Sequence, residues 1–125
     1  MLKKLSLAIA LFWTLLIPLL CLINTNEIPQ VEINNIDKLV HFTFYFIFSG
    51  LWFMYFYTKS APINLTKISG YILLFSVLYG GVIEVLQGAF TETRVADIND
   101  AIANSLGALF AYSIMRICLK NKVTL

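Results

Sequence analysis

The 125-residue chain carries few charged side chains for its length. Hydrophobic residues make up 59% of the chain and charged residues only 13%, whereas ordinary soluble domains carry roughly 25% charged residues. A soluble core of this size could not bury so much apolar surface, so the composition predicts a single integral membrane domain over residues 1–125. The net charge of +2, without a basic patch, argues against nucleic acid as a partner.

Four apolar runs are long enough to cross a bilayer as helices, which takes about 20 residues each. They cover approximately residues 5–23, 39–57, 68–90 and 101–119. The first run follows Lys3 and Lys4, as the apolar part of a signal peptide would. It is long for a signal peptide and lacks a small-residue cleavage site, so we expect a retained anchor. The sequence therefore predicts an all-α integral membrane protein, a four-transmembrane-helix bundle.

Basic side chains gather in the segments that flank one side of the predicted bundle. Seven of the nine lie there: Lys3, Lys4, Lys59, Lys67, Arg116, Lys120 and Lys122. The opposite side holds Lys38 and Arg94 together with most acids, namely Glu27, Glu32, Asp37, Glu92, Asp97 and Asp100. By the positive-inside rule, both termini are expected to be cytoplasmic (N-in/C-in), in a multi-pass protein of the cell membrane.

The two cysteines, Cys21 and Cys118, fall near opposite membrane faces in this topology. That separation excludes an intramolecular disulfide, because bridged cysteines have Cα atoms within about 7 Å. Two cysteines and one histidine also give no support to a zinc finger.

Polar side chains enter the predicted spans from the acidic side. Helical spacing arranges them in stripes: Asp37, His41, Tyr45 and Ser49; Glu84 and Gln87 with Gly81 and Gly88; and Asp97, Asp100, Asn104, Gly107 and Ala111. Small residues mark close helix contacts in lipid. We therefore expect the three stripes to face one another and to form one pocket near the outer interface.

Glu84 stands out because it lies about six residues inside its span, on the order of 9 Å from the end. An ionisable group at that depth marks a functional site by default and needs a partner; we expect Arg94, with His41 as the second candidate. Structural roles also fit these residues individually: helix caps or dipole partners for Asn35, Asp37, Asp97 and Asp100, a helix-locking cluster for Glu84, Gln87 and Arg94, and packing beside Tyr45 for His41.

The stretches DKLVHFTFYF (37–46) and EVLQGAFTETRVADINDAIANSLGALFAY (84–112) resemble the VanZ-like membrane protein family. The family pattern is matched at Asp37, Lys38, His41, Phe42, Glu84, Gln87, Arg94, Asp97, Asp100, Asn104 and Gly107. The resemblance covers three of the four spans. It implies a membrane protein associated with resistance to glycopeptide antibiotics, notably teicoplanin, and it implies no particular reaction.

Three functions remain open from the sequence. In the first, the protein acts on a lipid at the outer leaflet, with Glu84, His41 and Asp100 as candidate catalytic groups. Its candidate substrate-binding residues are Asp37, Lys38, Tyr45, Gln87, Arg94, Asp97 and Asn104. Its partners would be membrane lipids, a lipid-linked cell-wall precursor or a lipoglycopeptide. The second function is non-catalytic binding or shielding, and the third, less favoured, is proton-coupled transport in which Glu84 titrates.

A cofactor is not specified by any pattern in the chain. Asp97 with Asp100 offers oxygen ligands to a divalent cation, but no metal-ligand motif singles out a metal site. The oligomeric state is likewise left open by the sequence.

Overall fold

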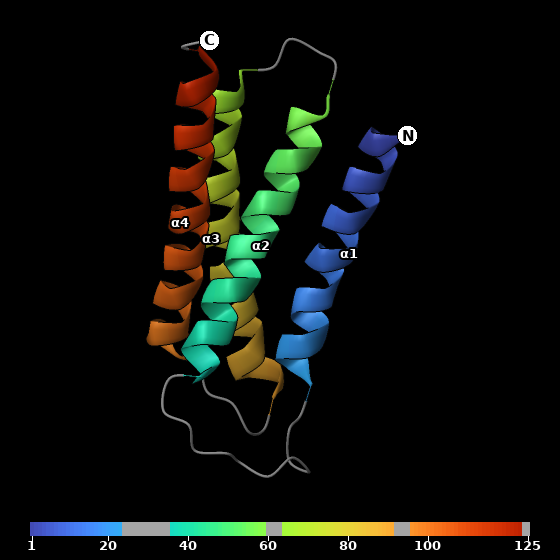
Figure 1. Cartoon of the computed structure of the whole chain (residues 1–125). Coiled ribbons are helices and arrows are strands. Elements are labelled where there is room, and N and C mark those ends of the chain that lie inside the picture. The colour runs from blue at the N-terminus through green and yellow to red at the C-terminus, as the bar shows by residue number, and fades with distance from the viewer. Residues whose placement is uncertain (24–35, 60–63, 92–95, 124–125) are drawn as a thin grey trace.

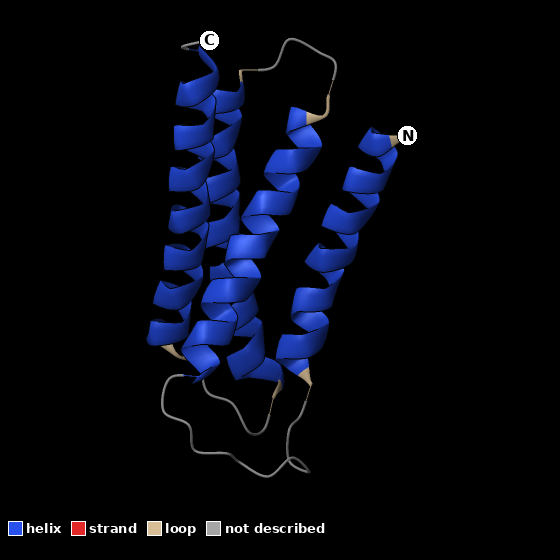
Figure 2. Cartoon of the chain, in the orientation of Figure 1, coloured by secondary structure: helices blue, strands red, loops and turns tan. Residues whose placement is uncertain are grey.

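The computed structural model describes residues 1–23, 36–59, 64–91 and 96–123, and over these ranges it contains four helices and no strand (Figure 2). The helices are α1 (Leu2–Leu22), α2 (Ile36–Tyr57), α3 (Leu65–Phe90) and α4 (Ile98–Val123). Each is long and apolar enough to cross a membrane. The predicted all-α architecture, with four helices that could span a membrane, is confirmed.

Each helix begins three residues before the predicted span, and α4 also continues past the predicted end. The added first turns carry charged side chains such as Lys3, Asp37 and Lys67. These residues lower the local hydropathy without interrupting the helical hydrogen bonds. Their side chains can reach the polar interface while the backbone stays helical, so hydropathy underestimates the length of the helices.

The four helices run alternately up and down, so that both termini lie at one end of the bundle (Figure 1). At the opposite end α1 and α3 finish while α2 and α4 begin. Helix α2 contacts all three other helices, whereas α1 contacts only α2 and α3 among the described residues. The first helix is therefore the peripheral one, and α2, α3 and α4 form the compact part of the bundle.

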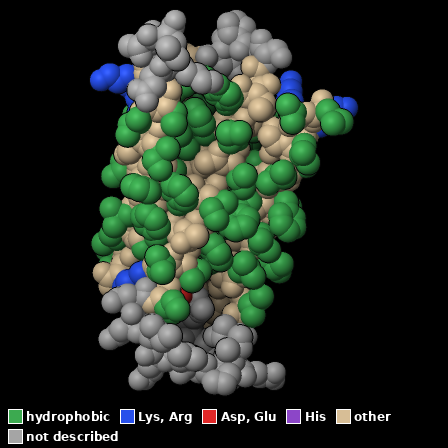
Figure 3. Space-filling view, in the orientation of Figure 1, with side chains coloured by type: hydrophobic (Ala, Val, Ile, Leu, Met, Phe, Trp, Pro, Cys, Tyr) green, Lys and Arg blue, Asp and Glu red, His purple; other side chains and the backbone are tan. Residues whose placement is uncertain are grey.

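The core is aromatic and aliphatic, and its outer surface is apolar as well. One buried cluster lies where α1 packs against α2 and α3, and it includes Ile17, Tyr45, Phe48 and Ile83. Leu, Ile, Val and Phe side chains are exposed along all four helices, and they cover the visible face between the two ends (Figure 3). A surface of this kind suits a lipid solvent, in which exposed apolar side chains carry no penalty.

Two glycines permit close helix contacts. A Cβ atom on Gly107 would collide with the backbone carbonyl of Phe42, so this glycine lets α4 lie directly against α2. On α3 the equivalent residue is Gly80, where a Cβ would lie 3.2 Å from Asn104 and from Tyr45. The expectation that Gly81 shares the inner face of α3 is wrong, because it is exposed and a Cβ there would meet no atom within 4 Å.

Polar contacts tie the helices together in the middle of the bundle. The indole nitrogens of Trp13 and Trp52 donate to the Phe44 carbonyl and to Thr14 Oγ1, both at 3.1 Å. The Ser49 and Ser76 hydroxyls lie 2.8 Å apart between α2 and α3. Because hydrocarbon offers no alternative partner, each such hydrogen bond favours one packing of the helices.

The cysteines do not form a disulfide. Cys21 is buried near the end of α1 and Cys118 is exposed near the end of α4, and neither is part of a disulfide. The two helix ends lie at opposite ends of the bundle (Figure 1), in agreement with the topology predicted from the loops.

Candidate functional site

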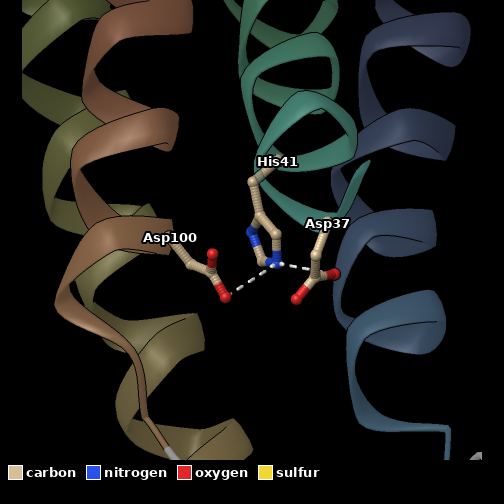
Figure 4. A group of neighbouring side chains, drawn as sticks. All are labelled: Asp37, His41 and Asp100. Atoms are coloured by element: carbon tan, nitrogen blue, oxygen red, sulfur yellow. Dashed lines mark ion pairs between the residues drawn. The ribbon is translucent and has the colours of Figure 1, made fainter. Parts of the chain in front are cut away.

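His41 is the centre of the polar side chains at the end of the bundle where α2 and α4 begin. It lies in the second turn of α2 with only 2% of its side chain exposed. Its Nδ1 atom is 3.0 Å from Asn104 Oδ1 and 3.4 Å from Glu84 Oε1. Its Nε2 atom is 3.9 Å from Asp37 Oδ1 and 3.8 Å from Asp100 Oδ2, so the ring lies between two carboxylates on that side (Figure 4).

Lys38 links the same group to the start of α4. Its ammonium lies 3.7 Å from Asp97 Oδ2 and 3.8 Å from Asp100 Oδ1. At these distances the contacts are ion pairs without short hydrogen bonds. The lysine therefore balances part of the negative charge of both acids.

Asp97 has the helix-capping role considered from the sequence. Its Oδ1 accepts a 2.8 Å hydrogen bond from the backbone N–H of Asn99 in the first turn of α4. That hydrogen bond and the nearby Lys38 lower the pKa of the Asp97 carboxyl below its usual range. The residue thus starts α4 and at the same time holds Lys38.

Glu84 reaches the group from α3, and its carboxyl side chain is 6% exposed. Besides His41, it contacts Asn104, whose Nδ2 donates to Glu84 Oε1 at 3.5 Å. The favoured pairing with Arg94 lies outside the described residues. The second candidate partner, His41, is in contact with the carboxylate.

These contacts join seven residues from three helices into one connected group, which we call the polar cluster. It consists of Asp37, Lys38, His41, Glu84, Asp97, Asp100 and Asn104. The expectation that the polar stripes of α2, α3 and α4 face one another is confirmed for these residues. Gln87 is buried one turn beyond Glu84, and Tyr45 is fully buried one turn beyond His41.

Three buried polar atoms have no hydrogen-bond partner within the part of the chain that the structure describes: Tyr45 Oη, Glu84 Oε2 and Asp100 Oδ1. All three belong to residues predicted as candidate site residues. Burying an unsatisfied polar atom costs about 1–3 kcal/mol, so each of these atoms calls for an explanation, such as a functional role or an ordered water or ion.

Gly80 was not predicted from the sequence, although it shapes the deep side of the cluster. It lies four residues before Glu84, on the same face of α3, and its missing side chain gives room to Asn104 and Tyr45. The helical spacing of residues 80, 84 and 87 would have identified Gly80. The predicted stripe included Gly81 instead, which is one residue away.

A separate apolar groove of about 290 Å³ lies between α2 and α3 in the other half of the bundle. It is lined by Trp52, Phe56, Ile68, Tyr71, Ile72 and Phe75. Its lining contains none of the polar-cluster residues, and in a bilayer such a groove faces the acyl chains.

Chemically, the polar cluster combines a buried imidazole, four carboxylates of which three lie around the ring, one amide and one amine. An imidazole and a carboxylate in contact can exchange a proton with a ligand, and the carboxylate oxygens can accept hydrogen bonds from hydroxyl or amide groups. Asp37, His41 and Asp100 also offer one nitrogen and two oxygen atoms within 4.8 Å of one another, as metal ligands would.

The fold defines a class of protein. Four helices that are long and apolar enough to cross a membrane are typical of a multi-pass membrane protein. The model of the family described as VanZ/LLP1 matches residues 4–119, and the chain belongs to this family. No curated protein and no solved structure matches the chain.

Proposed function

We propose that the polar cluster binds the headgroup of an amphiphilic molecule of the cell envelope. The molecule would be a lipid-linked cell-wall precursor or a lipoglycopeptide antibiotic such as teicoplanin, and binding would lower the susceptibility of the cell to such antibiotics. The cluster lies in the first two turns of α2 and α4 and in the last two turns of α3. In a bilayer this depth corresponds to the boundary between headgroups and acyl chains, where a lipid presents its polar part.

The observation that carries the proposal is the placement of the unsatisfied atoms. A purely structural network in lipid is stable when all its members are paired. Here, within the described residues, the buried atoms without a hydrogen-bond partner are Tyr45 Oη, Glu84 Oε2 and Asp100 Oδ1. Two of them belong to the polar cluster and the third lies one turn deeper, so the unused hydrogen-bonding capacity is concentrated at one place.

The composition of the cluster narrows the kind of headgroup. Carboxylates and the Asn104 amide suit hydroxyl and amide groups, such as those of sugars and peptides, because carboxylates accept hydrogen bonds from these donors. A phosphate would need positive charge, which Lys38 provides within the described residues. A headgroup with several hydroxyl or amide groups and at most a few phosphates is therefore the best chemical match.

Catalysis is proposed as part of the same function, with Glu84 and His41 as the proton-transferring groups and Asp100 orienting the imidazole. His41 lies in contact with both carboxylates. An imidazole between two carboxylates can take a proton from a hydroxyl group and return it. A non-catalytic binding or shielding protein would use the same contacts without this exchange.

The test compares two conservative changes in the cluster with one change in the middle of the bundle. Sensitive cells expressing Glu84→Gln, Asp100→Asn or Ser49→Ala are assayed for teicoplanin susceptibility, and membrane abundance is measured in parallel. Both cluster variants keep their shape and hydrogen-bonding capacity but cannot accept a proton, so we expect normal abundance and lost protection. Ser49→Ala, which removes a structural hydrogen bond, should keep protection in proportion to its abundance.

Full protection by both cluster variants would contradict a role for these carboxylates. A parent protein that gives no protection against teicoplanin would remove the resistance phenotype from the proposal. Copurifying lipid, identified by mass spectrometry from the parent and from Glu84→Gln, then tests headgroup binding directly.

A further inference from the structure

We propose that Asp37, His41 and Asp100 form a binding site for a divalent transition-metal ion, Mn²⁺ or Zn²⁺. The metal site shares its three side chains with the polar cluster, but it can be measured without knowing the ligand of the cluster. Asp37 and His41 come from adjacent turns of α2, and Asp100 faces them from the first turn of α4 (Figure 4).

The spacing of the three side chains fits a shared ion. One oxygen of each carboxylate and one nitrogen of the imidazole lie within 4.8 Å of one another. For three atoms so placed there is a point within about 2.8 Å of all of them, while metal–ligand bonds measure about 2.0–2.6 Å. Side-chain rotations of less than about 1 Å at the ligand atoms would therefore close the site around an ion.

The hydrogen bonds on the other side of the imidazole favour metal binding at Nε2. Asn104 Nδ2 donates to Glu84 Oε1, which orients the amide so that its Oδ1 lies 3.0 Å from His41 Nδ1. An amide oxygen can only accept, so Nδ1 carries a proton. In the neutral ring Nε2 then has its lone pair directed toward Asp37 and Asp100.

This arrangement is the one that metal-ligating histidines adopt. The ring nitrogen that does not bind the metal usually donates to a carbonyl or carboxylate, which fixes the tautomer and raises the basicity of the ligand. Asn104 and Glu84 supply that contact here. A lone pair facing two carboxylate oxygens is repulsive unless a proton or a metal ion lies between them, and a metal ion would make all three groups its ligands.

Independent support comes from the oxygen atoms of the buried acids. Asp100 is 6% exposed and its Oδ1 has no hydrogen-bond partner among the described residues. Lys38 approaches that same Oδ1, at 3.8 Å, and leaves Oδ2 directed at the imidazole. The lysine therefore balances part of the acidic charge without occupying the position proposed for the ion.

The site also has an open side. The Asp37 side chain is 51% exposed, in contrast to the buried imidazole and to Asp100. An ion could thus enter from the aqueous interface and keep positions for water or a ligand, as catalytic metal sites do. One imidazole and two carboxylates match Mn²⁺ and Zn²⁺ better than Mg²⁺, which prefers oxygen ligands alone.

The test measures metal binding by the purified, metal-stripped full-length protein in detergent. Mn²⁺ is titrated while free Mn²⁺ is followed by electron paramagnetic resonance, and Zn²⁺ competition is measured in the same samples. We expect one ion per chain, and Asp37→Asn should weaken binding by about tenfold or more, because even loss of an outer-shell partner costs about 10–100-fold. Asp37 is exposed, so this variant is expected to fold.

The charge-matched control is Asp97→Asn, which removes a carboxylate of the same interface that lies outside the proposed ligands. Its effect on Mn²⁺ affinity should stay within about threefold, because Asp97 is partly exposed, pairs with Lys38 and would act on the ion only through screened attraction. Pulsed resonance should detect a coupled nitrogen nucleus in the Mn²⁺ complex of the parent, and His41→Gln should abolish that signal.

Two results would overturn the metal site. The first is a folded parent protein, verified by size-exclusion chromatography and circular dichroism, that binds neither Mn²⁺ nor Zn²⁺ at millimolar concentration. The second is an equal loss of Mn²⁺ affinity in Asp37→Asn and Asp97→Asn. That result would mean that the ion is attracted by the overall negative charge and not held by Asp37. Either outcome leaves the headgroup proposal to its own susceptibility and lipid measurements.

Discussion

The polar cluster and the middle of the bundle both bury polar side chains in a protein surrounded by lipid, but they satisfy them differently. In the middle, Trp13, Trp52 and Tyr79 each donate to an atom of another helix, and Ser49 pairs with Ser76. In the cluster, contacts of 3.4–3.9 Å join the charged groups, and two carboxylate oxygens have no hydrogen-bond partner within the described chain.

This difference separates residues that hold the helices together from residues that are available to a ligand. Hydrogen bonds between transmembrane helices contribute on average about 0.6 kcal/mol each. Those in the middle of the bundle join uncharged groups, so they favour one packing of the helices without burying a charge. Carboxylates near an imidazole and a lysine cost more to bury than such bonds return. Their concentration at one end of the bundle is what the proposed binding site would require.

The largest expected effect concerns the orientation of the bundle. If its two ends lie on opposite sides of the membrane, cysteines at the two ends should differ in their accessibility to a labelling reagent. Native Cys118, exposed near the end of α4, should react with a membrane-impermeant maleimide only after permeabilisation. A cysteine introduced at residue 96 in a Cys118→Ser background should react in intact cells. The reverse pattern would contradict the cytoplasmic assignment of both termini.

The next effect concerns the packing that brings α4 against α2. Gly107→Ala places a methyl group on the Phe42 backbone, and we expect a loss of stability of about 3 kcal/mol together with low membrane abundance. Gly81→Ala is the matched control, because nothing lies within 4 Å of the added methyl group. It should stabilise the helix by about 0.5–1 kcal/mol. Unfolding in mixed micelles measures both, and equal effects would mean that this helix contact is wrong.

A smaller effect is expected where α1 is attached. Trp13→Phe keeps the aromatic contact with Phe44 but removes the hydrogen bond to its carbonyl, and we expect a loss of about 0.5–1.5 kcal/mol. Because α1 contributes no residue to the polar cluster, antibiotic protection per folded molecule should not change. A specific loss of protection at normal abundance would show that the middle of the bundle also acts on the site.

The smallest effect is a pH dependence at the start of α4. The pKa of Asp97 is lowered by its hydrogen bond from Asn99, so the folded state favours the ionised carboxylate. The stabilising contribution is present above the ordinary aspartate pKa of about 3.9 and is lost as the pH falls through the lower, folded value. The melting temperature of Asp97→Ala should be slightly below that of the parent at pH 7, and the difference should shrink as the pH falls below the ordinary aspartate pKa and vanish below the folded one. A difference that persists in acid would indicate a contribution other than charge.

The sequence alone determined the four spans, because apolar runs of this length have few alternatives to membrane helices. It also identified the inner faces of α2 and α4, since the spacing of His41, Tyr45 and Ser49, or of Asp100, Asn104 and Gly107, follows the helical period over several turns. All six residues are buried. On α3 the pattern was ambiguous by one residue, and Gly80 replaced Gly81 at the helix contact because neighbouring positions differ by about 100° around the axis.

Only the tertiary structure decided which side chains meet. Glu84 had two candidate partners in the sequence, and the contact with His41 and Asn104 depends on the relative depth of α2, α3 and α4 in the bundle. The grouping of Asp37 with Asp100 around one ring nitrogen has the same origin, because these acids stand 63 residues apart in the sequence. Periodicity fixes the face of a helix on which a side chain lies, whereas close packing through Gly80 and Gly107 sets how far each helix slides along its neighbour and so which faces touch.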